Sequence, residues 1–302
     1  MDVLSAVGIF ALLLWSYDTF KSLARICWGL CRQQWTVGSD NYEKRYGKCA
    51  VITGGSDGIG RQYAMFFAGQ GLNIVLIAMP DEKLANTALE IEQKFKVKVK
   101  SIPVDYSKGY EVYNYLKEKI ADLEIGVLVN NVGTGQCYAT YFDADSIDGH
   151  RRIVNVNINA AVMMSHIVLP QMKQRRRGLV INVSSAFGLT PVPTVLMYGA
   201  SKAFMLSFSL AMREELRPFG VECQTVTPYF VKTTLTGPFA GTYAGWLVCA
   251  KLEHFSRFLT MTIGKTAQTT GYWVHGWIVT GLKLLPTDLA CRMYHVFGKF
   301  QM

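Results

Sequence analysis

The apolar run Cys49-Ala-Val-Ile-Thr53 leads directly into the glycine-rich stretch Gly54-Gly-Ser-Asp-Gly-Ile-Gly60, and a helix-like sequence follows. A short apolar run bounded by turn residues predicts a buried strand. Strand, glycine turn and helix, in this order, form the local context that a dinucleotide phosphate site requires. We expect Gly54 to permit a sharp turn, Gly58 to let the backbone approach a pyrophosphate, and Gly60 to let the helix pack closely. Because glycine clusters also serve plain turns, other motifs must support this interpretation.

A second motif, Tyr198-Gly-Ala-Ser-Lys202, pairs a tyrosine with a lysine one helical turn later. Positions i and i+4 share one face of a helix, so both side chains can point at one ligand. A neighbouring ammonium favours the ionised phenol, and we therefore expect the pKa of Tyr198 to fall from about 10 towards neutrality. Such a tyrosine can pass a proton to or from a carbonyl or alcohol oxygen. The same spacing is also common on any amphipathic helix.

Strand-like and helix-like segments alternate along the chain. Apolar runs predict strands at 49–53, 73–78, 99–103, 127–130, 179–183 and 222–227. Helical patterns lie between them, near 60–68, 81–95, 108–121, 151–173 and 198–217. Strict alternation predicts an α/β fold with one domain, a doubly wound parallel sheet of Rossmann type with helices on both faces. The motifs fall at the C-terminal ends of predicted strands, where such sheets bind ligands.

Composition bounds the classes of function. The 302 residues can bury one full core, and no repeat or low-complexity tract divides them. Seven cysteines without a C-x-x-C pair argue against a disulfide framework. The histidines form no H-x-x-x-H pair, so we expect no metal site. The net charge of +9 comes without a module of basic and aromatic residues, which disfavours nucleic acid as a partner.

The N-terminus carries the second compositional signal. Residues 3–17 are almost entirely apolar, yet they are fewer than the about 20 that a full membrane span needs. A cleaved signal peptide is disfavoured for two reasons. The chain begins with an acidic residue where a signal peptide has a positively charged n-region, and no small-x-small cleavage site follows. We interpret residues 1–37 as an uncleaved membrane anchor, with an amphipathic surface helix as the alternative. Lys21, Arg25 and Arg32 on its C-terminal side predict that the following domain faces the cytosol.

Taken together, the motifs resemble those of the short-chain dehydrogenase/reductase family in their order and spacing. The resemblance covers residues 47–234 and rests on Thr53-Gly-Gly-Ser-Asp-Gly-Ile-Gly60, Asn130-Asn-Val-Gly133, Ser185 and Tyr198-x-x-x-Lys202. Further stretches, including Pro228-Tyr-Phe-Val231, are similar to the 17β-hydroxysteroid dehydrogenase type 12 and type 3 branch. That branch includes the very-long-chain 3-oxoacyl-CoA reductases. The resemblance implies an oxidoreductase that reduces a ketone on a lipid, a 3-oxoacyl-CoA or a 17-ketosteroid, to a secondary alcohol.

The resemblance also implies which residues form the site. The catalytic set is Asn157, Ser185, Tyr198 and Lys202. The cofactor-binding set is Gly54, Ser56, Asp57, Gly58, Ile59, Gly60, Asp105, Asn130, Tyr198, Lys202 and Thr233. Within it, Asp105 would contact adenine, Asn130 would border the adenine ribose, and Thr233 would contact the nicotinamide carboxamide. On the residues alone, Asn157 could merely satisfy a helix carbonyl, and Ser184 is better explained as a turn serine.

The choice of cofactor depends on the end of the second predicted strand. An acid there would bind the ribose hydroxyl of NAD, whereas a basic residue would accept the extra phosphate of NADP. This chain has Ala78-Met-Pro80, without the arginine usual in the branch, and Asp81 is typical of a helix N-cap. The missing acid favours NADP(H) over NAD. Arg61 or Lys83 could supply the positive charge.

The remaining expectations concern substrate and setting. Residues 234–264, within a catalytic domain at 48–302, are rich in aromatic residues and correspond to the family's substrate lid. An apolar lid suits a lipid substrate, but such stripes equally form core or a dimer contact, so a homodimer stays open. The resemblance suggests the endoplasmic reticulum membrane. The alternative function is a dehydrogenase fold without turnover that acts as a lipid-binding or scaffold protein.

Overall fold

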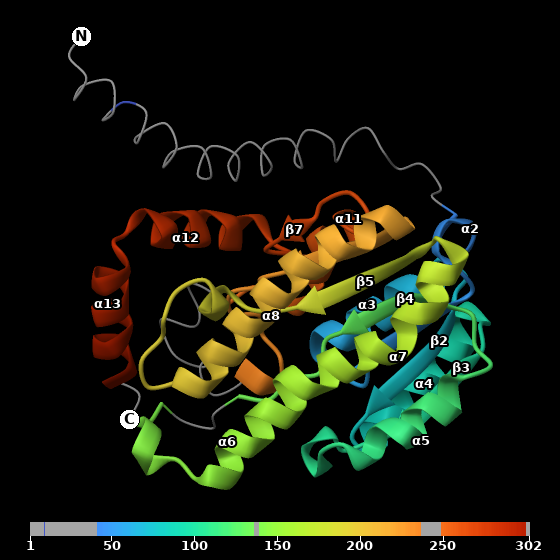
Figure 1. Cartoon of the computed structure of the whole chain (residues 1–302), viewed down its shortest axis with the longest axis horizontal. Coiled ribbons are helices and arrows are strands. Elements are labelled where there is room, and N and C mark those ends of the chain that lie inside the picture. The colour runs from blue at the N-terminus through green and yellow to red at the C-terminus, as the bar shows by residue number, and fades with distance from the viewer. Residues whose placement is uncertain (1–8, 10–40, 136–138, 237–248, 300–302) are drawn as a thin grey trace.

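The chain forms one seven-stranded parallel sheet in the order β3-β2-β1-β4-β5-β6-β7 (Figure 1). The computed structural model describes residues 9, 41–135, 139–236 and 249–299. The strands are β1 Cys49–Thr53, β2 Asn73–Ala78, β3 Val99–Pro103, β4 Ile125–Asn130, β5 Gly178–Val183, β6 Val221–Val226 and β7 Gln268–Thr269. The prediction of a Rossmann-type parallel sheet is confirmed. Only the two-residue β7 had no counterpart among the predicted strands, because so short a run carries no periodicity.

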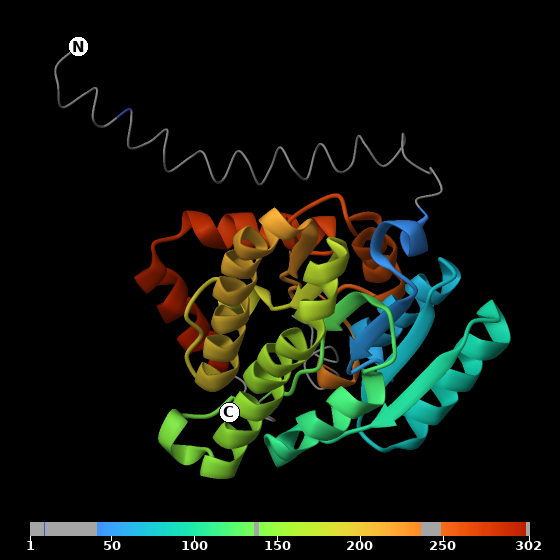
Figure 2. The ribbon, with the colours of Figure 1, turned by 45° about the vertical axis from the view of Figure 1, so that its right-hand side comes forward.

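Helices cover both faces of this sheet (Figures 1 and 2). The helices of the described residues are α2 Tyr42–Tyr46, α3 Gly58–Gly69, α4 Glu82–Phe95, α5 Glu111–Ile120, α6 Ile147–Ile153, α7 Ala160–Arg175, α8 Leu196–Leu216, α11 Leu252–Met261, α12 Trp273–Leu284 and α13 Thr287–Lys299. One apolar cluster joins α3, α4 and α11 to one face of the sheet, and another joins α5, α7 and α8 to the opposite face. Alternation along β1 explains the two clusters: Ala50 and Ile52 belong to the first, and Val51 belongs to the second.

Among the described residues the longest helical segment is Ile147–Arg175, which joins α6 and α7 through a π-helical segment, Val154–Asn159. By length and hydropathy alone it could cross a membrane. It packs instead along β4 and β5, with Met164 and Val168 fully buried in the second cluster. Its apolar character is therefore that of a core helix. The periodicity predicted this helix, but it did not reveal the π-helical segment within it.

Two predicted segments lie wholly or partly outside the described residues. The proposed anchor at 1–37 is outside apart from residue 9. The predicted lid at 234–264 is described at its two ends, where Thr234–Thr236 forms a short turn of helix and α11 packs through Phe255 and Leu259 into the first cluster. Residues 237–248 lie outside. The described part of α11 is thus core, one of the two alternatives left open by the sequence.

Candidate active site

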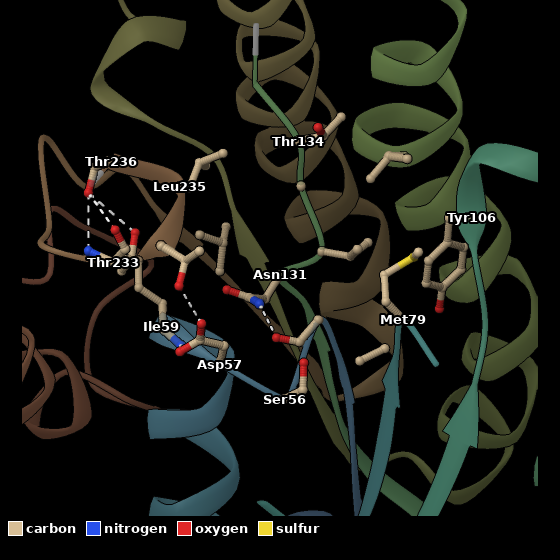
Figure 3. Close-up of a pocket in the computed structure, with 18 of the residues that line it drawn as sticks. Ser56, Asp57, Ile59, Met79, Tyr106, Asn131, Thr134, Thr233, Leu235 and Thr236 are labelled. Carbon is tan, nitrogen blue, oxygen red and sulfur yellow. Dashed lines mark hydrogen bonds between the residues drawn. The ribbon is translucent and has the colours of Figure 1, made fainter. Parts of the chain in front are cut away.

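A cavity of about 610 Å³ opens at the C-terminal edge of the sheet, where parallel α/β folds bind ligands. Figure 3 shows its walls: Ser56, Asp57 and Ile59 come from the turn after β1, Met79 and Tyr106 stand on one side, and Thr233 and Leu235 stand on the other. The predicted site residues that line it are Gly54, Ser56, Asp57, Gly58, Ile59, Asp105, Ser185, Tyr198, Lys202 and Thr233. The fold thus gathers residues from both halves of the chain around one space.

The glycine turn has the geometry that its sequence predicted. Gly54 and Gly58 adopt φ values of +63° and +54°, which favour glycine. A Cβ atom on Gly60 would lie 2.1 Å from the carbonyl oxygen of Gly54 and 2.5 Å from Nδ2 of Asn131, so only glycine fits there. Helix α3 begins at this turn, with its N-terminal end at the cavity wall. Backbone N–H groups that no side chain covers, next to a helix N-terminus, can bind a phosphate group. These residues therefore fit the pyrophosphate of a dinucleotide.

A three-residue polar network stands at the mouth of the cavity. Asp57 Oδ2 accepts hydrogen bonds from Lys83 Nζ at 2.8 Å and from Thr234 Oγ1 at 2.6 Å. Burial alone would raise the pKa of Asp57, but the bonds from Lys83, Thr234 and the Gly58 amide outweigh it and hold the pKa below its usual value. The network joins the glycine turn, α4 and the start of the predicted lid. Lys83 is thereby fixed as a cation in the cavity wall.

The two cations that the sequence offered for the cofactor phosphate have different surroundings. Met79, at the end of β2, is 51% exposed and lines the cavity. Lys83 also lines it, whereas Arg61 pairs with Glu90 and is not a lining residue. The Asp81 side chain accepts the Leu84 amide as the N-cap of α4. The N-cap interpretation of Asp81 is therefore correct, and Lys83 is the better placed of the two cations.

Tyr198, Lys202 and Ser185 meet in the cavity wall. Both helix residues point the same way, with Lys202 Nζ 5.7 Å from the centroid of the Tyr198 ring. A hydrogen bond links the Tyr198 hydroxyl to Ser185, whose Oγ also accepts the Phe187 amide. Lys202 is buried and donates to the Val183 carbonyl at 3.2 Å. The i,i+4 spacing therefore does bring the pair to one ligand-facing surface.

The electrostatics of this pair differ from the expectation. Burial raises the pKa of Tyr198, although the bond from Ser185 lowers it in part. Burial lowers the pKa of Lys202 to about 8. The expected fall in the Tyr198 pKa was wrong, because desolvation disfavours the phenolate more strongly than the Ser185 hydrogen bond favours it. Tyr198 is accordingly held in its protonated form near neutral pH.

Asn157 lies in the π-helical segment, and its side chain is hydrogen-bonded to the loop after β4. Its Oδ1 accepts the Thr134 amide at 2.7 Å, and its Nδ2 donates to the Thr134 carbonyl and to Ser201 Oγ, both at 2.9 Å. A Cβ atom on Gly133 would lie 3.3 Å from Lys202 Nζ and 3.6 Å from Asn157 Oδ1. Asn157 therefore satisfies a neighbouring loop and not its own helix, and it stands close to Lys202. The extra residue of a π turn is a frequent feature of functional sites.

Asn130 does not line the cavity, in contrast to its predicted place beside the adenine ribose. Its side chain is buried below the strand ends, where Nδ2 donates to Ser165 Oγ at 3.0 Å and to Asn182 Oδ1 at 2.8 Å. The next residue, Asn131, lines the cavity and donates to the Thr53 and Gly54 carbonyls. Alternation along β4 explains the difference, since adjacent side chains point to opposite sides. Two adjacent asparagines gave the sequence no means of choosing between them.

The two remaining predicted cofactor contacts do face the cavity. Asp105 caps a short turn by accepting the Ser107 amide at 2.9 Å. Thr233 donates its amide to Thr236 Oγ1 at 3.1 Å, and its methyl group lies against Gly58. Other lining residues had no signal in the sequence: Tyr106, Thr134, Arg152, Val156, Leu235 and Thr236. They stand on loops and helical segments that the folding of the sheet brings to the cavity.

Comparison with known proteins agrees with this geometry. The family model for short chain dehydrogenases matches residues 48–243. A protein from Pongo abelii named inactive hydroxysteroid dehydrogenase-like protein 1 is 38% identical, over 91% of this chain and 83% of its own length. The very-long-chain 3-oxoacyl-CoA reductase of Macaca fascicularis is 39% identical, over 88% of this chain and 83% of its own.

Among solved structures, the fold is similar to that of L-sorbose reductase from Gluconobacter frateurii, complexed with NADPH and L-sorbose. The TM-score is 0.65 and the identity 25%, and the match covers 76% of this chain and 97% of that one. The sequence relatives therefore include both a named reductase and a protein named inactive, so the site itself must decide between them.

Proposed function

This chain belongs to the short-chain dehydrogenase family, and we propose that it uses NADPH to reduce a ketone on a lipid to a secondary alcohol. One observation carries the proposal: Tyr198, Ser185 and Lys202 line the same cavity as the glycine turn. A proton donor and a dinucleotide cradle in one space are what ketone reduction requires. The complete set of Asn157, Ser185, Tyr198 and Lys202 adds to this support.

The side chains divide the chemistry of the reduction among them. NADPH, when bound, supplies the hydride. Tyr198 is the general acid, because its hydroxyl lies in the cavity wall beside Ser185 and can donate its proton to the carbonyl oxygen. Ser185 donates a hydrogen bond that orients the same oxygen, and the Lys202 ammonium favours the phenolate that proton transfer leaves behind. Asn157 holds Thr134 and Ser201, and through them the loop and helix beside Lys202.

The cofactor phosphate would be recognised at the end of β2. Positions 78 and 79 hold Ala78 and Met79, so neither provides an acidic side chain to bind the ribose hydroxyl of NAD. Lys83 lines the cavity there and provides the charge that the 2′-phosphate of NADPH needs. The named similarity to an NADPH complex supports the same choice.

A lipid is the proposed substrate class, either a 3-oxoacyl-CoA or a 17-ketosteroid. The name of the Macaca fascicularis relative supports the acyl-CoA. We further propose attachment to the endoplasmic reticulum membrane through residues 1–37, with the catalytic domain in the cytosol, and self-association into a homodimer. The apolar composition of residues 3–17 and the cations that follow support the attachment.

A second candidate function is lipid binding without turnover, which the relative named inactive favours. One residue, Tyr198, distinguishes the two functions. A protein that keeps the fold for binding alone has no need of a proton donor in the wall, whereas here Tyr198 is present and hydrogen-bonded to Ser185. The reductase is therefore the better-supported proposal.

The deciding experiment presents the purified full-length protein with NADPH and a panel of 3-oxoacyl-CoAs of increasing length and 17-ketosteroids. We expect oxidation of NADPH with one of the two classes. The control is a matched panel of the corresponding alcohols with NADPH, which should remain unreacted. Tight binding of a lipid without NADPH oxidation by any member of either class would favour the non-catalytic function instead.

A further inference from the structure

Helix α12 exposes an apolar stripe that the fold does not use. Trp273, Trp277 and Leu284 are 43%, 50% and 43% exposed, and their spacing of i, i+4 and i+11 places them along one side of the helix. The opposite side, through His275 and Val279, is buried. A helix that packs its inner face on the core normally presents polar residues outside. This helix is apolar on both sides, so we expect its exposed stripe to be covered by a binding partner.

Helix α13 follows α12 after a sharp turn (Figure 1) and carries a second exposed apolar stripe. Leu289, Met293 and Val296 are 47%, 53% and 55% exposed at spacing i, i+4 and i+7. The charges on the two helices are mainly positive: Lys283 and Arg292 are exposed, and Asp288 is the one acid among residues 273–299. We call the six exposed apolar residues of the two helices the α12–α13 surface. Tryptophan beside lysine and arginine is the composition that favours the headgroup region of a phospholipid bilayer.

The position of α12 agrees with a membrane as the partner. Figures 1 and 2 show α12 along the same upper side of the molecule as α2, where the described fold begins. The chain preceding α2 contains the apolar run at 3–17. One bilayer could therefore hold the N-terminal segment and meet α12 without any rearrangement of the described fold.

We propose that the α12–α13 surface rests in the headgroup layer of a phospholipid bilayer, a proposal that depends on the membrane attachment proposed above. Trp273 and Trp277 would lie at the boundary between headgroups and acyl chains, and Lys283 and Arg292 would meet the lipid phosphates. The surface then acts as a second, peripheral contact beside the N-terminal anchor. Two contacts on one face hold a protein in a fixed orientation, which a single attachment point does not.

This orientation would bear directly on substrate access. The Tyr294 ring of α13 lies 5.7 Å from the Phe187 ring, which lies 6.3 Å from the Tyr198 ring. A hydrogen bond joins Tyr294 to Tyr229, a residue of the cavity wall. The docking helix thus contacts the wall of the site. A lipid ketone could pass from the bilayer to Tyr198 without crossing bulk water.

The test places the full-length protein in phosphatidylcholine vesicles with added phosphatidylserine, whose acyl chains carry bromine near the glycerol end. Emission from the two tryptophans is isolated as the difference between wild type and the Trp273→Phe/Trp277→Phe variant. We expect bromine to remove most of this difference emission. As a matched control, Leu89→Trp introduces an indole at a 54% exposed position of α4, on the side away from α12, and its emission should persist.

Three outcomes would overturn the proposal in distinguishable ways. Protein that does not float with the vesicles refutes the membrane attachment together with this surface. Protein that floats while its difference emission resists bromine but is quenched by acrylamide shows that the stripe faces water, and it refutes the surface alone. Difference emission that resists both bromine in the lipid and acrylamide in the water assigns the stripe to a protein partner, either a second copy or the chain's own N-terminal segment.

Discussion

Lys83 Nζ lies 2.8 Å from Asp57 Oδ2, so a helix that follows the second strand is bound to the turn that begins α3. The same carboxylate oxygen also accepts the hydroxyl of Thr234. The glycine turn of the cofactor site is therefore not an isolated loop. Its carboxylate is held by hydrogen bonds from a lysine 26 positions later and a threonine 177 positions later.

The first prediction is that Lys83→Ala weakens NADPH selectively. Loss of a charge-assisted contact to the 2′-phosphate should raise the KM for NADPH about tenfold, while the KM for NADH changes little. Steady-state kinetics with both cofactors measure the effect. Arg61→Ala is the matched control, because its guanidinium pairs with Glu90 outside the cavity lining. Equal losses with NADPH and NADH would show that Lys83 serves the turn and not the phosphate.

The second prediction concerns Tyr198→Phe. Removing the hydroxyl removes the general acid but leaves the cavity shape intact, so turnover should fall by about 10²–10⁴-fold while the Kd for NADPH stays unchanged. Stopped-flow reduction and cofactor fluorescence separate the two quantities. Tyr115→Phe, at an exposed position of α5, controls for loss of a phenol elsewhere. Ketone reduction within a factor of a few of wild type would refute the assignment.

The sequence predicted the sheet because its signals are local. Each apolar run matched a strand within two residues, since β-strand burial depends on the identity of a few consecutive residues. The sequence likewise predicted the roles of Gly54, Gly58 and Gly60, because only glycine tolerates their backbone angles or the close approach of a carbonyl group. These features need no knowledge of distant contacts.

What the sequence did not predict depends on distant contacts. The choice between Asn130 and Asn131 follows from which side of β4 faces the cavity, and that is fixed by register with β1 and β5. The pKa of Tyr198 is raised by its burial, which depends on elements remote in sequence. The pairing of Lys83 with Asp57 and the exposed stripe of α12 also depend on how separate elements pack.

The third prediction links Lys202 to the pH dependence of stability. Burial lowers its pKa from 10.5 to about 8, so between these values the unfolded chain holds a proton that the folded chain has released. The free energy of unfolding therefore gains up to about 3 kcal/mol from this group as pH rises through that window. Lys202→Met removes the group. Denaturant melts at several pH values should show the stability of Lys202→Met, relative to wild type, declining from neutral pH to about pH 10; a constant difference would contradict the burial of an ammonium.

The fourth prediction compares two glycines. Gly60→Ala would bring a methyl group against the Gly54 carbonyl, so the turn must shift, at a cost of about 1–3 kcal/mol in stability and with loss of tight NADPH binding. Gly281→Ala in α12 is the control: no atom lies within 4 Å of the added methyl, and helix propensity should make the change neutral or slightly stabilising. Thermal melts with and without NADPH measure both. Similar behaviour of the two variants would show that the close approach at Gly60 is not required.

The last prediction separates the two proposed membrane contacts. Deleting residues 2–37 removes the apolar run but leaves the described fold, which begins at residue 41, and the α12–α13 surface. We expect full-length protein to resist alkaline carbonate extraction from microsomes, and the deleted form to be extracted by it, because headgroup contacts alone do not survive that treatment. Cofactor binding should persist in the deleted form, since β1 and the glycine turn are intact. Protease added to sealed microsomes should cleave the catalytic domain of the full-length protein, whereas protection of that domain, or a soluble full-length protein, would contradict the proposed anchor and its orientation.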